Sequence, residues 1–341
     1  MSGSSDHNAK RDDVDGSTLH LLVSLPALDE ETSVAAVVAG IPRRIAGVGQ
    51  IDVLVVDDGS SDETAAVAAE AGAHVIRHDT PRGVGAAFHT ALAFAMAQAV
   101  DLLVTIDADG QFDPRDIPAL VAPVVAGEAD FVTASRFADP KLAPRMPALK
   151  RWGNRQLSRL VSRLTGRRFH DVSCGMRCYN RRAMLSLNLM GAFTYVQEVV
   201  LNLSFKGLRI IEVPVSVRGE REYGQSRVAG NLWRYALHTS RIILRAYRDY
   251  KPLQFFGAIA AALLTPGLLL ELFFFGHYLA TGSFSPHKWA GFAGAGLATL
   301  SLMVFFMGMI GDMLNRHRVY LEELLYDQRL RNAEPPASER D

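Results

Sequence analysis

Two uncharged segments near the C-terminus restrict the possible folds of this chain more than any other feature. Residues 253–270 form an uncharged run of 18, and residues 289–311 form an uncharged run of 23. A helix rises about 1.5 Å per residue, so roughly 20 apolar residues cross the hydrocarbon core of a bilayer. We therefore predict transmembrane helices over residues 253–280 and 288–314, joined by a short loop.

Basic residues flank this predicted hairpin on one side. They precede the first span and follow the second, and they are Arg241, Arg245, Arg248, Lys251, Arg316 and Arg318. The loop of residues 281–288 carries a single lysine. Because positively charged flanks stay in the cytoplasm, we expect both termini on that side. Residues 1–18 are polar and lack an apolar core, so we expect a disordered tail there, and residues 315–341 form a predicted cytoplasmic tail.

Apolar runs of strand length alternate with helical patterns in the N-terminal part of the chain. The predicted strands are residues 19–25, 51–56, 74–77, 102–106 and 131–135, and the predicted helices are residues 32–45, 62–71 and 83–99. This alternation is typical of an α/β fold, in which helices cover both faces of a mostly parallel sheet. Ligands of such sheets bind at the carboxyl ends of the strands.

Acidic residues follow three of these predicted strand ends. They are Asp29 and Glu30, Asp57 and Asp58, and Asp107 and Asp109. The segment Asp107-Ala108-Asp109 places two carboxylates on one side of an extended chain, where hard oxygen ligands suit Mg²⁺ or Mn²⁺. Such a cation would bridge a diphosphate and neutralise the charge of a leaving group. The alternative is that these carboxylates only form turns and cap helices.

Charge is distributed unevenly along the chain, although its formal net charge is zero. Residues 1–135 hold 7 basic and 21 acidic side chains, whereas residues 136–251 hold 23 basic and 7 acidic ones. A basic block next to an apolar segment favours an anionic membrane surface or a phosphate-bearing ligand. No nucleic-acid-binding motif accompanies it, so we expect no nucleic acid partner. Two cysteines are too few for a disulfide framework.

Two stretches of the basic block have arginines at helical spacing. The first covers residues 149–168, and the second covers residues 231–250, where Arg234, His238, Arg241, Arg245 and Arg248 share one face. Both patterns are typical of amphipathic helices that lie in a membrane interface. Ordinary helices with a solvated outer face would show the same arginine spacing. The interfacial interpretation is favoured because the second stretch leads directly into the predicted hairpin.

A set of short motifs resembles family-2 glycosyltransferases, within them the dolichyl and polyprenyl phosphate sugar synthases, over roughly residues 20–320. The motifs, in chain order, are residues 26–30, 56–60, 107–111, 135–136, 171–177, 212–214 and 221–227. The resemblance implies a nucleotide-diphospho-sugar transferase fold of the GT-A type over residues 19–230. It also implies a metal-dependent enzyme, with Mg²⁺ or Mn²⁺ as cofactor.

The resemblance also implies roles for particular residues. Those expected to hold the nucleoside are Pro26, Glu30, Val56 and Asp58, and those expected to hold the metal and diphosphate are Asp107, Ala108, Asp109 and Gln111. Those expected to grip phosphates are Arg136, Lys150, Arg177, Arg221 and Arg227. Two positions depart from the family pattern: Arg227 stands where lysine is usual, and Leu28 stands where an aromatic residue is usual.

These implications favour the inverting transfer of one hexose, from GDP-mannose or UDP-glucose, to a polyprenyl or dolichyl monophosphate at the cytoplasmic membrane face. A phosphate acceptor is already anionic at neutral pH, so a single displacement requires no general base. A polysaccharide synthase of the same fold is one alternative, although the chain lacks a Q-x-x-R-W motif and a larger set of spans. A non-catalytic membrane scaffold is another alternative, and a homo-oligomer is possible.

Overall fold

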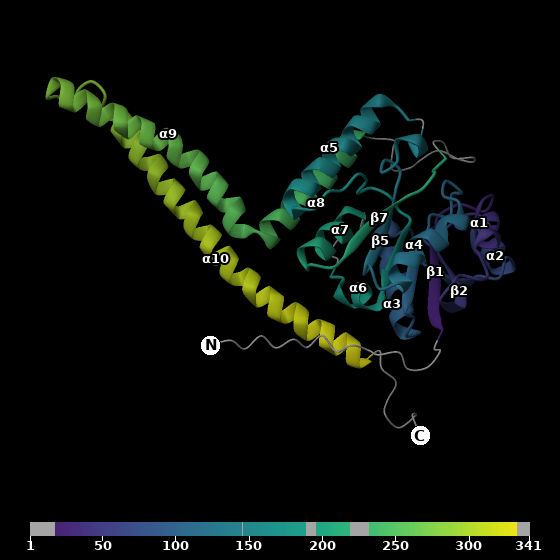
Figure 1. Ribbon diagram of the computed structural model, residues 1–341. Helices are drawn as coiled ribbons and strands as arrows, with labels where there is room; N and C mark the ends of the chain where they lie inside the picture. Colours follow the sequence, from purple (N-terminus) through teal and green to yellow (C-terminus); the bar gives the residue numbers. More distant parts are fainter. Residues whose placement is uncertain (1–17, 145, 189–195, 219–231, 333–341) are drawn as a thin grey trace.

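The computed structural model describes residues 18–144, 146–188, 196–218 and 232–332. The described chain forms an α/β domain and a long helical hairpin that projects from it (Figure 1). Arg221 and Arg227, two of the predicted phosphate-binding residues, lie outside the described residues.

The α/β domain contains a seven-stranded sheet with the strand order β3-β2-β1-β4-β6-β5-β7. The strands are β1 (Leu19–Ala27), β2 (Val48–Asp57), β3 (His74–Arg77), β4 (Leu102–Thr105), β5 (Phe131–Ser135), β6 (Arg177–Asn180) and β7 (Ile210–Pro214). Among the strands of the described residues, only β6 runs antiparallel to its neighbours, β4 and β5. The predicted mostly parallel sheet is thus confirmed, but the reversed strand β6 is absent from the sequence-based prediction.

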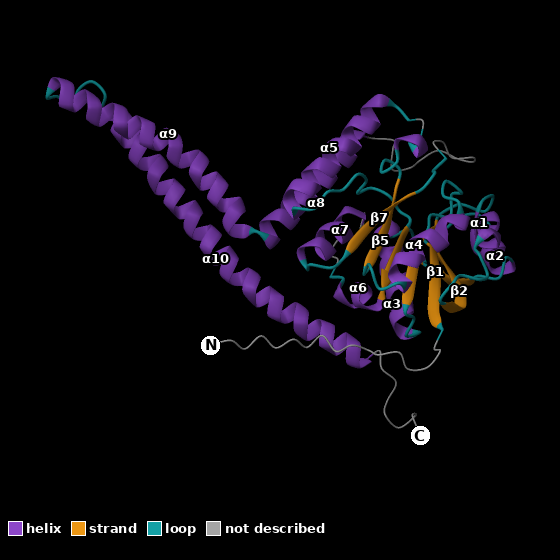
Figure 2. Ribbon diagram, in the orientation of Figure 1, coloured by secondary structure: helices purple, strands orange, loops and turns teal. Residues whose placement is uncertain are grey.

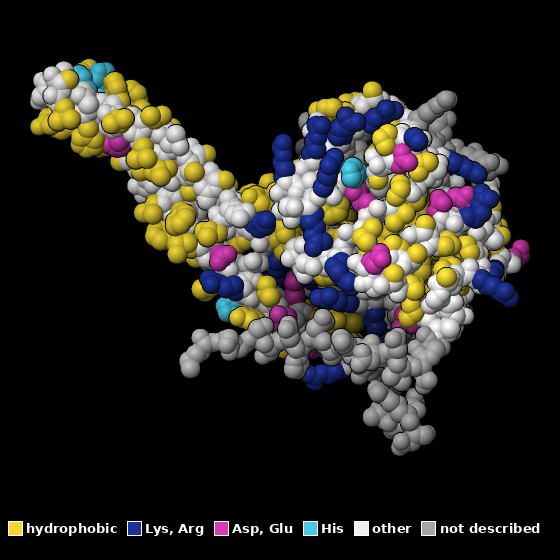
Figure 3. Space-filling model, viewed as in Figure 1, with side chains coloured by type: hydrophobic (Ala, Val, Ile, Leu, Met, Phe, Trp, Pro, Cys, Tyr) yellow, Lys and Arg dark blue, Asp and Glu magenta, His cyan; other side chains and the backbone are white. Residues whose placement is uncertain are grey.

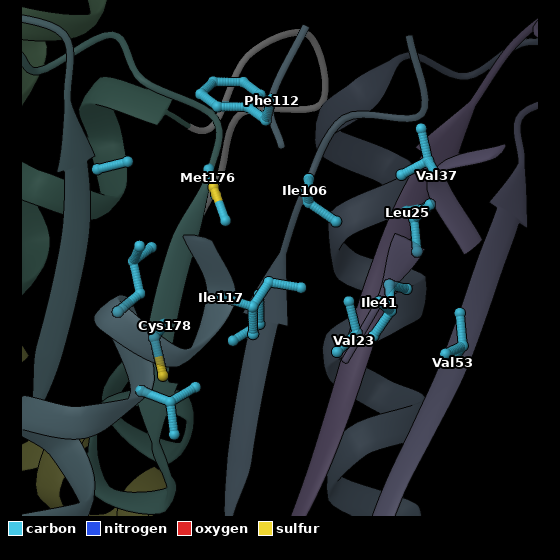
Figure 4. Close-up of a cluster of buried hydrophobic side chains, with 14 of the residues drawn as sticks. Val23, Leu25, Val37, Ile41, Val53, Ile106, Phe112, Ile117, Met176 and Cys178 are labelled. Carbon is cyan, nitrogen blue, oxygen red and sulfur yellow. The ribbon is translucent and has the colours of Figure 1, made fainter. Parts of the chain in front are cut away.

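Helices cover both faces of the sheet (Figure 2). They are α1 (Val34–Gly40), α2 (Thr64–Glu70), α3 (Val84–Ala97), α4 (Ile117–Val125), α5 (Ala148–Thr165), α6 (Arg181–Ser186), α7 (Val196–Phe205) and α8 (Leu232–Tyr250). One buried cluster joins the sheet to α1, α2 and α4, and Figure 4 shows part of it. The other cluster joins the opposite face to α3 and α5–α8.

The projecting hairpin consists of α9 (Pro252–Thr281) and α10 (Lys288–Asn332). Small residues bring the two helices close together: a Cβ at Gly267 would lie 3.1 Å from Leu297 Cβ. The hydroxyl of Ser301 donates to the carbonyl oxygen of Ala260 at 2.8 Å. The apolar windows of α9 and α10 have mean hydropathies of 2.0 and 1.9, and only 11% and 17% of them are buried. Both helices are therefore long and apolar enough to cross a bilayer and present most of that surface outward.

Helix α10 extends well beyond the predicted end of the second span at residue 314, because no glycine or proline interrupts residues 312–332. The first part of the predicted tail is therefore helical and returns to the α/β domain. Glu322 pairs with Lys206, the residue that follows α7, at 3.1 Å. Arg329 donates to the carbonyl oxygens of Leu185 and Leu187.

Candidate active site

The carboxyl ends of three neighbouring strands form one edge of the sheet. β1 lies between β2 and β4 and is parallel to both, so the segments that follow these strands leave on the same side. Ala27 of β1 is paired with Asp57 of β2. The acidic residues predicted to lie near one another therefore do follow adjacent strand ends.

Hydrogen bonds fasten the loop after β1 to the loop after β2. The carboxylate of Asp29, which has a φ of 50°, accepts from the backbone of Ser61 at 2.8 Å. The backbone N–H of Glu30 donates to Thr64 Oγ1 at 2.8 Å. Asp57 is fully buried, accepts from the backbone of Ser60 and pairs with Arg77. These carboxylates do have the turn-forming role considered above, and they give the first wall of the site its shape.

Asp58 is directed toward the loop between β3 and α3. Its carboxylate accepts from the backbone N–H groups of Arg82 at 2.9 Å and Gly83 at 2.7 Å, and it contacts His78 Nδ1 at 2.7 Å. The side chain is buried. Asp58 therefore sets the position of the loop that opens α3.

The other two predicted nucleoside residues of the strands lie in or beside the sheet. Val56 is fully buried, so it packs inside the domain and supports the strand ends that border the site. Pro26, its partner in β1, is partly exposed at the strand end.

The D-x-D segment follows β4 and is mostly buried. Ala108 packs into the core cluster, whereas Asp107 is partly exposed. Asp109 is 5% exposed, and its Oδ1 accepts from the backbone N–H of Gln111 at 3.0 Å. The carbonyl oxygen of Gln111 in turn accepts from the backbone of Arg218, which lies just past β7. The segment is therefore held between the sheet and the strand that leads toward residues 221–227.

The oxygen donors of this segment fit a hard divalent cation. Two carboxylates and one amide oxygen are ligands that Mg²⁺ and Mn²⁺ prefer, and a diphosphate supplies further oxygens. The described residues contain no group of three or more His, Cys, Asp or Glu side chains that would form a complete protein cage. The donor set therefore fits a cation that is shared with a phosphate ligand.

Arg136 and Asp171 form the best-connected ion pair on the other side of the site. Arg136 follows β5, and its Nε and Nη2 donate to the two oxygens of Asp171 at 2.6 and 3.0 Å. The side chain of Asp171 is fully buried, and that of Arg136 is 17% exposed. Burial alone would raise the pKa of Asp171, but the charge and hydrogen bonds of Arg136 lower it below its usual range.

The segment that carries Asp171 is fixed to β7 by a second carboxylate. Glu212 accepts from the backbone N–H groups of His170 and Asp171, the latter at 2.8 Å, and from His170 Nδ1 at 2.9 Å. The motifs of residues 171–177 and 212–214, which are separate in the sequence, are thus one structural unit.

Helix α5 brings a lysine and an asparagine to the same side of the site. Lys150 is exposed in the first helical turn, and Asn154 lies one turn later on the same face. Asn154 Nδ2 is 3.4 Å from Asp171 Oδ1. Asn154 is absent from the sequence-based prediction, although its i, i+4 spacing from Lys150 was a usable signal.

Arg177 lies in the interior, which differs from its predicted position among the phosphate-binding residues. It is fully buried on β6, and its Nε donates to the carbonyl oxygen of Cys174 at 2.9 Å. The guanidinium also lies over the ring of Phe131, 5.6 Å from its centroid. The antiparallel direction of β6 places this side chain beneath the loop of residues 171–176.

Burial also raises the pKa of Cys174 to about 12, so its thiol stays protonated.

Comparisons with known proteins agree with the fold and the motifs. The model of the family "Glycosyl transferase family 2" matches residues 23–186. An uncharacterized glycosyltransferase of Mycobacterium tuberculosis is 37% identical over 211 residues, which are 62% of this chain and 90% of that protein. A dolichyl-phosphate hexose transferase of Haloferax volcanii is 31% identical over 198 residues, which are 58% of this chain and 82% of that protein.

A solved structure shows the same fold. It is the glucosyl-3-phosphoglycerate synthase of Mycobacterium tuberculosis in complex with Mn²⁺, uridine-diphosphate and glucosyl-3-phosphoglycerate. The TM-score is 0.54 at 24% identity, covering 67% of this chain and 80% of that one. The predicted GT-A type fold is thus confirmed. From the family match and these relatives, we conclude that the chain belongs to glycosyl transferase family 2.

Proposed function

We propose that this protein transfers one hexose from a nucleotide-diphosphate sugar to a polyprenyl or dolichyl monophosphate, with inversion at the anomeric carbon. The observation that carries this proposal is the position of the loop of residues 171–176. One end of the loop pairs with Arg136, and Gly175 at its other end lies against the carboxylate of Asp107. This connection supports an anionic acceptor site next to a diphosphate donor site.

The acidic strand ends form the donor site in this proposal. Asp107, Asp109 and Gln111 hold a divalent cation, Mg²⁺ or Mn²⁺, which supplies charge neutralisation to the departing diphosphate. Glu30, together with the wall formed by Pro26, Val56 and Asp58, receives the nucleoside. Asp58, which accepts from the backbone N–H groups of Arg82 and Gly83, fixes the start of α3, and the first turn of that helix lies toward the donor phosphates in this proposal.

Arginine and lysine side chains form the acceptor site. Arg136 is held by Asp171 with its side chain 17% exposed, and Lys150 is exposed on α5, one helical turn before Asn154. Arg221 and Arg227 complete the set by virtue of the family motif. These cations offset the repulsion between a lipid phosphate and a diphosphate, and they orient the attacking oxygen. Because that oxygen is already ionised, a single displacement follows without a general base.

The apolar hairpin and the basic helices support a position of this site at a lipid surface. Figure 3 shows hydrophobic side chains covering the projecting hairpin and Lys and Arg side chains gathered over the region of α5. On α5, Leu149 is 64% exposed and Trp152 is 60% exposed, between exposed arginines. On α8, Leu244 is 57% exposed beside Arg241 and Arg245. Such helices suit a membrane interface, with both termini and the α/β domain on its cytoplasmic side.

A donor screen tests the proposal. Purified protein in detergent receives Mg²⁺ or Mn²⁺, polyprenyl phosphate and, in turn, GDP-mannose, UDP-glucose and other GDP- and UDP-sugars. We expect a glycolipid with at least one hexose donor; the relative from Haloferax volcanii, which is named a hexose transferase, supports that choice. The variant Asp109→Ala is expected to lose the activity. If no donor yields a glycolipid, the proposal is wrong.

A further inference from the structure

Gly175 lies where any side chain would meet the first carboxylate of the D-x-D segment. A Cβ built on Gly175 would lie 2.7 Å from Asp107 Oδ2 and 3.1 Å from Asp107 Oδ1. The backbone of Gly175 is not in the left-handed region, so its φ does not require glycine. Glycine is required here because a larger side chain would collide with the Asp107 carboxylate.

The surrounding hydrogen bonds prevent the loop from moving away. Thr105 Oγ1 donates to the carbonyl oxygen of Gly175 at 2.9 Å. The next carbonyl oxygen, that of Met176, accepts from the backbone of Ala134 at 2.9 Å. The preceding one, that of Cys174, accepts from the buried guanidinium of Arg177. A side chain added at residue 175 would therefore displace the carboxylate rather than the loop.

Displacement of the Asp107 carboxylate should impair cation binding without impairing folding. The carboxylate stands at the end of a short side chain that is partly exposed, so it can rotate without disturbing the buried core. A protein with a rotated Asp107 side chain should still fold, but the carboxylate oxygens would no longer point toward the proposed cation. The buried hydroxyl of Thr105 and the guanidinium of Arg177 donate to the adjacent carbonyl oxygens of Gly175 and Cys174, so both hold this part of the loop in place.

We propose that Gly175 is a positioning residue of the donor site: its missing side chain, on a loop anchored by Thr105 and Arg177, sets the orientation of the Asp107 carboxylate toward a nucleotide-bound divalent cation. This inference rests on the proposed function only in assigning Asp107 to the cation. It gives Arg177 a part in the site that requires no contact with a ligand.

The test measures Mn²⁺ binding directly, by electron paramagnetic resonance, with the full-length protein in detergent and with GDP or UDP present. Substitutions beside metal ligands typically weaken affinity by about 10- to 100-fold, so we expect Gly175→Ala to weaken Mn²⁺ binding by roughly 10-fold. Nucleotide binding without metal and the unfolding temperature should stay close to wild type. The control Gly153→Ala adds the same methyl group where no atom lies within 4 Å, and it should bind Mn²⁺ as wild type does.

A second pair of variants covers the case in which Gly175→Ala fails to fold. Thr105→Val removes the hydrogen bond to Gly175 and should weaken Mn²⁺ binding severalfold, whereas Thr105→Ser keeps the hydroxyl and should restore it. Wild-type affinity in both Gly175→Ala and Thr105→Val would overturn the inference, as would a wild-type protein that binds no Mn²⁺ with nucleotide. Because no sugar transfer is measured, a wild type that binds Mn²⁺ but makes no glycolipid refutes only the proposed function.

Discussion

Asp58 and Asp109, on the acidic side of the candidate site, differ from Asp171, on its basic side, in the groups that hold them. In residues 1–135, where acidic side chains outnumber basic ones by 21 to 7, Asp29 and Asp58 accept hydrogen bonds from backbone N–H groups of neighbouring loops, and Asp109 accepts from the backbone N–H of Gln111 in its own loop. In residues 136–251, where basic side chains outnumber acidic ones by 23 to 7, Asp171 pairs with the guanidinium of Arg136. In the proposed function, the negative charge of the first half serves a cation, and the positive charge of the second half serves phosphates.

This difference predicts how each half responds when a charge is removed. A carboxylate held by backbone N–H groups can lose its charge while much of its loop geometry survives, so the main loss is functional. A buried carboxylate that loses its arginine is left uncompensated, so the main loss is stability. The first two predictions below test this contrast, and two further ones test the surface of α5 and the docking of α10, in order of decreasing effect.

The largest effect is expected for Asp109→Asn in the acidic half. The amide is similar in shape but removes the charge that a divalent cation requires, so we expect sugar transfer to fall on the order of 10³-fold. The unfolding temperature should change little, because Asn Oδ1 can still accept from the backbone of Gln111. Initial rates and thermal unfolding of the same preparation check this. A large loss of stability would contradict the contrast between the halves.

Arg136→Ala in the basic half should reduce stability by about 3 kcal/mol, because the buried carboxylate of Asp171 loses its partner. The pKa of Asp171 is lowered in the folded protein, so its stabilising contribution is present above an unfolded-state pKa of about 3.9 and is lost as pH falls through the lower folded-state value. In the variant, burial should raise this pKa instead. The stability deficit is therefore expected to be largest near neutral pH and to shrink toward acid.

Denaturant unfolding between neutral and acidic pH measures this deficit. The double variant Arg136→Ala with Asp171→Asn is the matched control, since it removes both charges and should recover part of the stability at neutral pH. A deficit that is independent of pH would show that the ion pair is not its source.

A smaller effect is expected when charge is removed from the exposed face of α5. Arg155 and Arg159 are both exposed beside Leu160, which is 43% exposed. If this face lies on an anionic membrane, Arg155→Gln with Arg159→Gln should raise the apparent KM for lipid acceptor by roughly 10-fold in vesicles rich in anionic lipid. The same two substitutions should change the apparent KM little in neutral detergent. An equal loss in both media would point to a role of these arginines within the protein.

The smallest effect is expected for Glu322→Gln on α10. Glu322 and Lys206 are 17% and 15% exposed, and burial lowers the pKa of Lys206 while the charge of Glu322 partly opposes that shift. Loss of the pair should cost about 1 kcal/mol. Hydrogen exchange of residues 315–332 should increase more than that of the sheet. Unchanged exchange in α10 would show that this pair does not hold the helix to the domain.

The sequence predicts the first half of the domain well because its signals are local. Strands β3 and β5 begin and end where the apolar pattern places them, and the acidic turns follow directly from the strand ends. The predicted helices are longer than α1 and α2, because their flanking residues form turns that join the two loops.

The second half depends on contacts between distant residues, which a single sequence does not display. Glu212 accepts from residues about 40 positions earlier, and β6 enters the sheet in reverse between β4 and β5. Nothing in the local pattern around Arg177 indicates that its guanidinium is buried beneath a loop. The return of α10 to Lys206 likewise joins segments that are far apart in the chain.

The most direct test of the whole account is analysis of the product formed with the donor that the screen identifies. Mass spectrometry and anomeric analysis of the glycolipid should show one hexose per polyprenyl phosphate, with the anomeric configuration inverted relative to the donor. A product that carries a chain of several sugars, or one that retains the donor configuration, would contradict the account.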